Sequence, residues 1–148
     1  MTEGEPVESL DQLEQIAIGA EIVTRKTISE SDVYLFAGIT GDFHPNHVDE
    51  VYMSEGSFGG RIAHGALTVG FMSAASTAFL QRSDFDAVSL GYDGIRFLAP
   101  VRFGDTLTIR YRISSKDPEK RRTVAEVEVT NQRDEKVAVA IHHLKFVR

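Results

Sequence analysis

The 148-residue chain has no cysteine, which excludes disulfide bonds and thiolate metal sites. It also has little positive charge: 16 Lys and Arg stand against 22 Asp and Glu, the net charge is −6, and no basic run is longer than residues 120–122. Nucleic acid is therefore not an expected partner. The chain does not open with a basic segment followed by an apolar one, so we expect it to be cytoplasmic and not secreted.

Residues 62–80 contain no Asp, Glu, Lys or Arg. Apolar residues surround the whole circumference of the helix that this stretch predicts, so we expect a helix that is buried on every side. Its Gly, Ser and Thr residues make it too polar for a membrane span, and no membrane partner is expected. Gly65 stands where the helix would begin, so its unpaired N–H can hold a carbonyl oxygen. The alternative role for Gly65 is close packing.

An acid and an imidazole precede this stretch. Asp42 and His47 are five residues apart on either side of Pro45, which blocks a helix, so a tight loop can aim both side chains into one small volume. That arrangement predicts acid–base chemistry. The alternative is a polar turn in which Asp42 caps a helix and His47 is exposed.

Two separate blocks around these residues carry a family likeness. Residues 41–49 read GDFHPNHVD, and residues 58–65 read FGGRIAHG. The segments FLAPV at 97–101 and GDTL at 104–107 continue it. Together these motifs resemble the MaoC-like, R-specific enoyl-CoA hydratase family of hot-dog-fold proteins.

The resemblance implies that Asp42 and His47 are catalytic and that the Gly65 N–H stabilises an enolate oxygen. It also implies substrate-binding or supporting roles for three further residues: Phe43, His64 and Ser73. Two positions depart from the family pattern, because His44 stands for the usual Asn and Asn46 for the usual aliphatic residue. Neither change removes the acid or the imidazole, but both can alter substrate choice or local hydrogen bonds.

The activity that the resemblance implies is the reversible addition of water to a trans-2-enoyl thioester, giving an R-3-hydroxyacyl thioester of CoA or of acyl carrier protein. Two alternatives remain open from the sequence. One is a hot-dog acyl-CoA thioesterase, which would activate water toward the thioester carbonyl. The other is a non-catalytic subunit that binds acyl thioesters. No metal or cofactor is expected in any of the three.

The remaining polar candidates are expected to have structural or surface roles. His142 and His143 are adjacent in a predicted strand, so their side chains point to opposite faces and cannot bind a metal jointly. Arg61 can meet either a CoA phosphate or a surface acid, and we expect the acid.

The pattern of the remaining chain predicts one short helix and several strands. Ser29 is a predicted N-cap, and a helix from it to about Thr40 would deliver Asp42 at its end. The alternation shifts by one residue at Gly94, which predicts a β-bulge, and changes phase again at residues 142–143. Alternation with period two predicts antiparallel strands within residues 21–28, 88–97, 107–113, 125–129 and 137–146.

Residues 1–148 are one domain's worth of chain. A buried helix and several half-buried strands are both satisfied by a curled sheet that wraps the helix. We therefore expect a single α+β hot-dog domain, a curved antiparallel β-sheet around a long central helix, with residues 1–15 as a loosely ordered or short-helical lead-in. Because one sheet cannot cover a whole helix, we expect a homodimer or a larger homo-oligomer.

Overall fold

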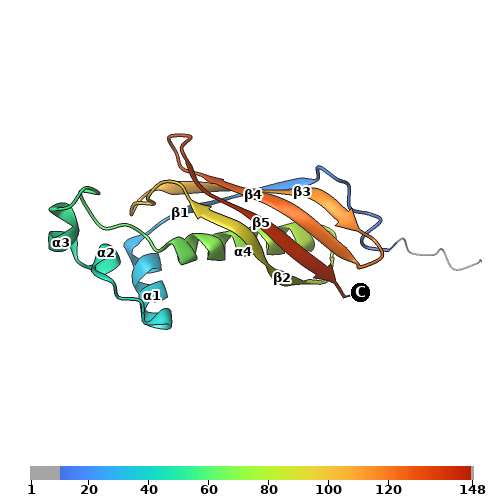
Figure 1. Cartoon of the computed structure of the whole chain (residues 1–148), viewed down its shortest axis with the longest axis horizontal. Helices are drawn as coiled ribbons and strands as arrows, with labels where there is room; N and C mark the ends of the chain where they lie inside the picture. The colour runs from blue at the N-terminus through green and yellow to red at the C-terminus, as the bar shows by residue number, and fades with distance from the viewer. Residues whose placement is uncertain (1–10, 148) are drawn as a thin grey trace, which may run out of the picture.

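One antiparallel sheet curves over one long helix in this protein (Figure 1). The structure is a computed structural model that describes residues 11–147. The strands lie in the order β1-β3-β4-β5-β2, and α4 (Gly65–Gln81) packs against the inner face of the sheet. The strands are β1 (Glu21–Thr27), β2 (Ala87–Phe97), β3 (Thr106–Asp117), β4 (Arg122–Thr130) and β5 (Lys136–Phe146). This arrangement confirms the predicted α+β hot-dog fold.

Three short helices gather beyond the N-terminal end of α4, away from the main sheet (Figure 1). They are α1 (Glu30–Thr40), α2 (Pro45–Val48) and α3 (Glu50–Ser54). The predicted N-cap of α1 is confirmed, since the Ser29 hydroxyl accepts the Asp32 N–H at 3.1 Å and the Asp32 carboxylate accepts the Ser29 N–H at 2.9 Å. This capping box fixes where α1 begins, and therefore where the chain leaves it.

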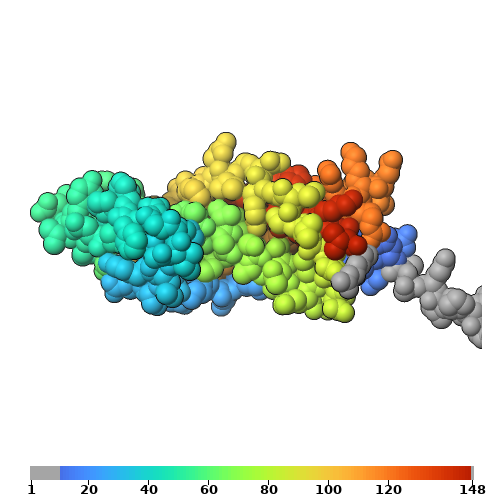
Figure 2. All heavy atoms as spheres, turned by 90° about the horizontal axis from the view of Figure 1, so that it is seen from below, coloured from blue at the N-terminus to red at the C-terminus, as the bar shows by residue number. Residues whose placement is uncertain are grey.

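Within one chain, α4 is buried on one face only. The buried residues are Thr68, Met72, Ala75, Ser76 and Phe79. The face turned away from the sheet is open to solvent (Figure 2), and apart from Gln81 at the helix end its exposed residues are small: Ala66, Gly70, Ser73, Ala74 and Thr77. The prediction of burial on every side is therefore wrong for the single chain, because one sheet covers only one side of a helix.

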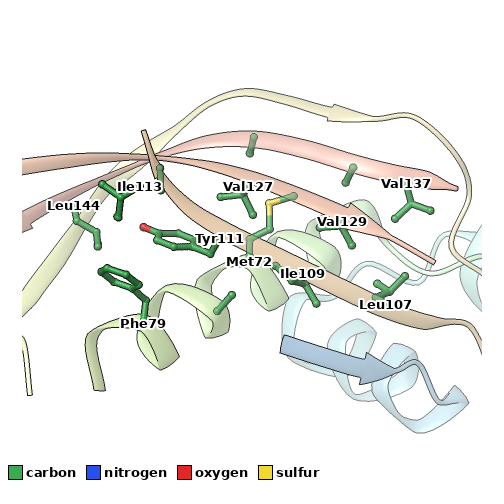
Figure 3. Close-up of a cluster of buried hydrophobic side chains, with 14 of the residues drawn as sticks. Met72, Phe79, Leu107, Ile109, Tyr111, Ile113, Val127, Val129, Val137 and Leu144 are labelled. Carbon is green, nitrogen blue, oxygen red and sulfur yellow. The ribbon is translucent and has the colours of Figure 1, made fainter. Parts of the chain in front are cut away.

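The inner face of the sheet supplies the other half of the core (Figure 3). In β3 the residues Leu107, Ile109, Tyr111 and Ile113 are buried in strict alternation, as the sequence predicted, and Ala125, Val127 and Val129 do the same in β4. Met72 and Phe79 of α4 point toward them (Figure 3).

The predicted change of phase at the adjacent histidines of β5 is wrong. The strand keeps one inward face from Ala138 to Phe146, and His142 lies on it, fully buried. The inward face was predicted wrongly because it carries small alanines and an imidazole and not large aliphatic side chains. His142 is tolerated there because both ring nitrogens have hydroxyl partners at 2.8 Å, Nδ1 with Tyr111 and Nε2 with Ser89.

The predicted opposite orientation of the two histidines is confirmed. His143 lies on the outer face, and its Nε2 is 2.8 Å from the Asp93 carboxylate. The predicted bulge in β2 is also confirmed, since the register with β5 shifts between Asp93 and Arg96, where Gly94 has a φ of +59°. A second shift between Ser89 and Gly91 was not predicted.

Part of the expected loose lead-in is packed. Leu13 is only 2% exposed and joins the main hydrophobic cluster, and the Lys116 ammonium donates to its carbonyl at 3.1 Å. Residues 11–15 are therefore not loosely ordered; they form a single turn, the short-helical alternative for this lead-in, in which the Glu14 N–H donates to the Asp11 carbonyl at 2.9 Å. Residues 1–10 lie outside the described part of the chain. Between residues 11 and 147, no helix has the length and hydropathy needed to span a membrane.

Candidate active site

The end of α1 sets the position of the acid. Gly41 follows the helix with a φ of +80°, a conformation that favours glycine, and its N–H donates to the Ala37 carbonyl at 2.8 Å. The next residue, Asp42, then leaves the helix with its N–H 3.2 Å from the Thr40 hydroxyl. Its carboxylate accepts the His44 N–H at 3.3 Å and is otherwise exposed.

Pro45 begins the short helix α2 and does not block it, which corrects the expected loop. A proline at the first helical position loses no hydrogen bond and is pre-set for the helix. The N-cap is His44, whose Nδ1 accepts the Asn46 N–H at 3.2 Å. Of the two departures from the family pattern, only His44 is used in this cap, because the Asn46 N–H that it accepts belongs to the backbone.

His47 sits at the end of this helical turn and is 9% exposed. Its Nδ1 is 2.7 Å from the Ile62 carbonyl, which can only accept, so Nδ1 carries the proton and Nε2 is left with a free lone pair. The Ile62 N–H donates in return to the Asn46 carbonyl at 3.0 Å. Burial holds the pKa of His47 below its ordinary value, against the opposing effects of the Ile62 hydrogen bond and the Asp42 charge. The ring is therefore neutral at pH 7 and able to accept a proton.

His64 supports both members of this pair. It is 2% exposed, its Nε2 donates to the Asp42 backbone carbonyl at 2.9 Å, and its ring stacks on His47 with centroids 3.7 Å apart. Phe36 of α1 also contacts the ring, with centroids 4.8 Å apart. The remaining nitrogen of His64, Nδ1, is buried and has no hydrogen-bond partner among the described residues.

The structure brings the predicted acid and imidazole together. One carboxylate oxygen of Asp42 and one ring nitrogen each of His47 and His64 lie within 4.8 Å of one another. These residue types can bind a divalent metal, but donors on one ion lie roughly 3.4 Å apart when each bond is about 2.1 Å. The cluster is better arranged to hold and move protons on one water molecule.

Gly65 is the first residue of α4, as predicted. Its backbone N–H makes no hydrogen bond within the described chain and lies at the positive end of the helix dipole. Gly65 and His47 line the same cavity, of about 390 Å³. The rest of its wall is largely apolar and is formed by Phe58, Ile62, Ala63, Thr68, Val137 and the loop 97–101. An acyl chain fits such a wall, and a thioester oxygen fits the free N–H.

Not every predicted residue reaches this cavity. Asp42 and His64 do not line it, although His64 stacks on His47 and an Asp42 carboxylate oxygen lies within 4.8 Å of a His47 ring nitrogen. Phe43 is 55% exposed and lies outside the lining. Ser73 is on the outward face of α4 and also outside the lining. Substrate contact by Phe43 and Ser73 stays a prediction.

Arg61 binds acids, as expected from the sequence. Its guanidinium donates to Glu50 at 2.6 Å and to Glu30 at 2.8 Å, which joins α3 to α1, and to the Tyr34 hydroxyl at 3.0 Å. The Tyr34 hydroxyl donates in turn to the Val48 carbonyl at 3.1 Å. These bonds tie together the three short helices on either side of the Asp42–His47 loop.

The predicted site residues leave out most of the residues that line the cavity, among them Thr68 and Phe97. Thr68 is 2% exposed, and its hydroxyl makes no hydrogen bond within the described chain. Phe97 was predicted only as part of a family segment and of an alternating strand. A buried hydroxyl inside the apolar run and an aromatic residue at the end of an alternating strand were the available signals, but neither shows which cavity the residue faces.

A sheet wrapped on a central helix, with an acid–imidazole site at the helix N-terminus, defines a hot-dog-fold protein with acid–base chemistry. Residues 14–137 match the MaoC like domain. The chain belongs to this family, which confirms the resemblance seen in the sequence.

Named relatives and solved structures agree with this assignment. The (R)-specific enoyl-CoA hydratase of Rhodospirillum rubrum is 42% identical over 112 residues, which cover 76% of each chain. The 3-hydroxybutyryl-CoA dehydratase of Methylorubrum extorquens is 38% identical over 109 residues, or 74% of this chain and 68% of that protein. The unliganded R-hydratase of Pseudomonas aeruginosa superposes with a TM-score of 0.77 at 29% identity, covering 90% of this chain and 84% of the other.

Proposed function

We propose that this protein is a hydro-lyase that catalyses the reversible hydration of trans-2-enoyl thioesters to R-3-hydroxyacyl thioesters. One observation carries the proposal: His47 Nε2 and the Gly65 N–H, which have no hydrogen-bond partner within residues 11–147, belong to residues that line one apolar cavity, and the Asp42 carboxylate lies within 4.8 Å of a His47 ring nitrogen. The activities named for the two curated relatives support it, and the R configuration is taken from the first of them.

The proposed reaction uses one water molecule held between Asp42 and His47. His47 Nε2 takes a proton from the water as its oxygen attacks C3 of the enoyl group, while the Asp42 carboxylate accepts the second O–H and fixes the orientation of the water. The electron pair moves to the thioester oxygen, where the Gly65 N–H stabilises the enolate. The imidazolium then delivers its proton to C2, so both parts of the water end in the product.

A panel of acyl-CoA esters tests the proposal and separates it from its alternatives. We expect loss of the conjugated-thioester absorbance with crotonyl-CoA and formation of R-3-hydroxybutyryl-CoA. Release of free thiol from butyryl-CoA without hydration would establish the thioesterase. Binding of both esters with no turnover of either would establish the binding subunit. The same assay with crotonyl-acyl carrier protein decides which carrier is preferred.

The proposed partner is a second copy of the chain. The outward face of α4 is made of small residues, and the free edge of β2 exposes Val88 by 49% and Leu90 by 48%. An exposed strand edge beside an uncovered helix face is a surface that pairing with another copy would bury. We expect a homodimer or larger assembly in sedimentation experiments, and a folded monomer at micromolar concentration would refute this. A cytoplasmic location stays a prediction.

A further inference from the structure

The ring of Phe97 packs directly on Gly65. A Cβ atom built on Gly65 would lie 2.6 Å from Cε2, 2.7 Å from Cζ and 2.9 Å from Cδ2 of that ring. Contacts this short do not occur between real side chains, so any residue other than glycine at position 65 has to displace the ring. The helix N-terminus and the aromatic ring are therefore fitted to each other.

The position of the ring is set by its backbone and not by deep burial. Phe97 is the last residue of β2 and pairs with Ala138 of β5, and the next N–H, that of Leu98, donates to the Val137 carbonyl at 2.9 Å. The side chain itself is 55% exposed, and it lines the same cavity as His47. The ring therefore forms a wall of the cavity, and this wall lies beside the Gly65 N–H, the proposed oxyanion donor.

This wall lies where a substituent on the reacting group would have to go. A thioester oxygen that accepts the Gly65 N–H places the thioester carbon, and hence the bonded C2, next to the ring that covers the Gly65 Cα. A hydrogen on C2 is small, but a methyl group there has to share the space that the ring fills. Packed interiors do not absorb an extra methyl group without displacing a neighbour.

We propose that Phe97 determines specificity at C2 of the substrate, so that the cavity takes unbranched 2-enoyl thioesters and rejects 2-methyl-branched ones. This inference rests on the proposed hydration at the same site. Phe97 has no part in proton transfer. It acts by filling the space beside the thioester that the absent Gly65 side chain leaves open.

The test compares crotonyl-CoA with its 2-methyl analogue, tiglyl-CoA, as substrates. One methyl group in an apolar pocket is worth about 10- to 200-fold in kcat/KM. We therefore expect Phe97→Ala to raise the tiglyl/crotonyl ratio of kcat/KM at least about tenfold. The matched control is Leu98→Ala, since Leu98 is similarly exposed at 53% and lines the same cavity, while the three atoms nearest to a Cβ on Gly65 all belong to Phe97. A ratio that stays the same in Phe97→Ala, or rises equally in Leu98→Ala, overturns the proposal.

A binding measurement keeps this test independent of turnover. Calorimetric Kd values for butyryl-CoA and 2-methylbutyryl-CoA should show the same preference in the wild type and its loss in Phe97→Ala. If no ester is hydrated but this preference is present, the proposed reaction fails while the role of Phe97 stands. If crotonyl-CoA is hydrated, but branched and unbranched esters bind equally well, the proposed role of Phe97 is wrong and the proposed reaction stands.

A double variant tests the contact itself. Gly65→Ala keeps the backbone N–H but pushes the ring into the cavity, so crotonyl-CoA turnover should fall while the fold is retained. Adding Phe97→Ala removes the clash, and most of the lost turnover should return. If the double variant is as slow as Gly65→Ala alone, the ring is not the element that the methyl group displaces, and the proposal is wrong.

Discussion

The protein contains two kinds of buried histidine environment, one under the sheet and one at the N-terminus of α4. Under the sheet, His142 is fully buried and both ring nitrogens meet hydroxyl groups. At the helix N-terminus, His47 and His64 each use one nitrogen to donate to a backbone carbonyl, and their other nitrogens have no partner in the described chain. Of these two nitrogens, the His64 Nδ1 is fully buried, and a buried polar atom without a partner is costly, so its retention points to a group that binds there.

The same contrast runs along α4 itself. Met72, in the middle of the helix, has no exposed surface and packs among apolar side chains of the sheet (Figure 3). Gly65 and Thr68, at its start, present a free N–H and a free hydroxyl to the cavity. One end of the helix therefore contributes to stability and the other to chemistry, and substitutions at the two ends should have separable effects.

The largest effect on stability is expected in the core. Met72→Ala should lower the free energy of unfolding by about 2–5 kcal/mol, because it removes buried methylenes and leaves a cavity. The kcat for crotonyl-CoA per folded molecule should stay within about twofold of the wild type. Denaturant unfolding measures the free energy of unfolding. The control is Gln81→Ala, at an exposed position on the same helix. A loss of kcat in folded Met72→Ala would break the separation between the two ends.

The pH dependence of stability should report on His142. Burial lowers the pKa of this imidazole to about 4, whereas in the unfolded chain it is near 6.5. The unfolded state therefore takes up a proton first, so the contribution of His142 is complete above pH 6.5 and is lost as the pH falls toward 4. The loss amounts to about 3 kcal/mol.

Unfolding of His142→Gln and of the wild type at several pH values measures this loss as a difference between the two chains. The difference in free energy of unfolding between the wild type and His142→Gln should fall by about 3 kcal/mol as the pH is lowered from 6.5 to 4. A difference that does not change with pH would show that the core imidazole takes up its proton as readily folded as unfolded.

At the helix N-terminus, Gly65→Pro should lower the catalytic rate far more than it lowers stability, although its Cβ meets the Phe97 ring. Proline suits the first position of a helix, but it removes the N–H, and loss of one oxyanion donor costs about a hundredfold or more in kcat. Because any Cβ at this position meets the Phe97 ring, Gly65→Ala is the control that keeps the N–H. Gly65→Pro should be slower than Gly65→Ala, and equal rates would remove the N–H from the mechanism.

The smallest effect is expected at Thr68. Thr68→Val keeps the shape of the side chain and removes a hydroxyl that has no partner in the described chain, so the free energy of unfolding should change by less than about 1 kcal/mol or increase. Thermal unfolding of Thr68→Val measures this change in stability, with Thr68→Ser, which keeps the hydroxyl, as the control. A loss of several kcal/mol would mean that the hydroxyl is bonded within the protein and that this end of α4 resembles the core.

The parts of the fold that follow a local period could be predicted from the sequence. The alternation of β3, the Ser29 cap and the glycine that ends α1 each depend on residues close in the chain, and the structure has them as predicted. The inward face of β5 could not be predicted in the same way. Its alanines are small because α4 lies against the sheet, and His142 is accepted because Tyr111 and Ser89 come from other strands.

The site residues differ in the same way: some could be predicted from local sequence and others could not. Asp42 and His47 were found because they are five residues apart in one motif, and Gly65 because a helix begins there. The stacking of His64 on His47 and the packing of Phe97 on Gly65 join segments that are 17 and 32 residues apart, and no period in the sequence connects them. The correction at Pro45 is different in kind, since a proline can start a helix as well as interrupt one.

The central claim, that Asp42 and His47 act as a unit on one water, is tested most directly by the hydration rate of crotonyl-CoA in three variants. Asp42→Asn and His47→Gln keep side-chain size, and each should lower kcat almost as far as the double variant does, because either loss disables the pair. Two control variants should keep the wild-type rate: Asp84→Asn, at an exposed position, and His143→Gln, on the outer face of the sheet. Near-normal hydration by either site variant, or losses that simply multiply in the double variant, would contradict the account.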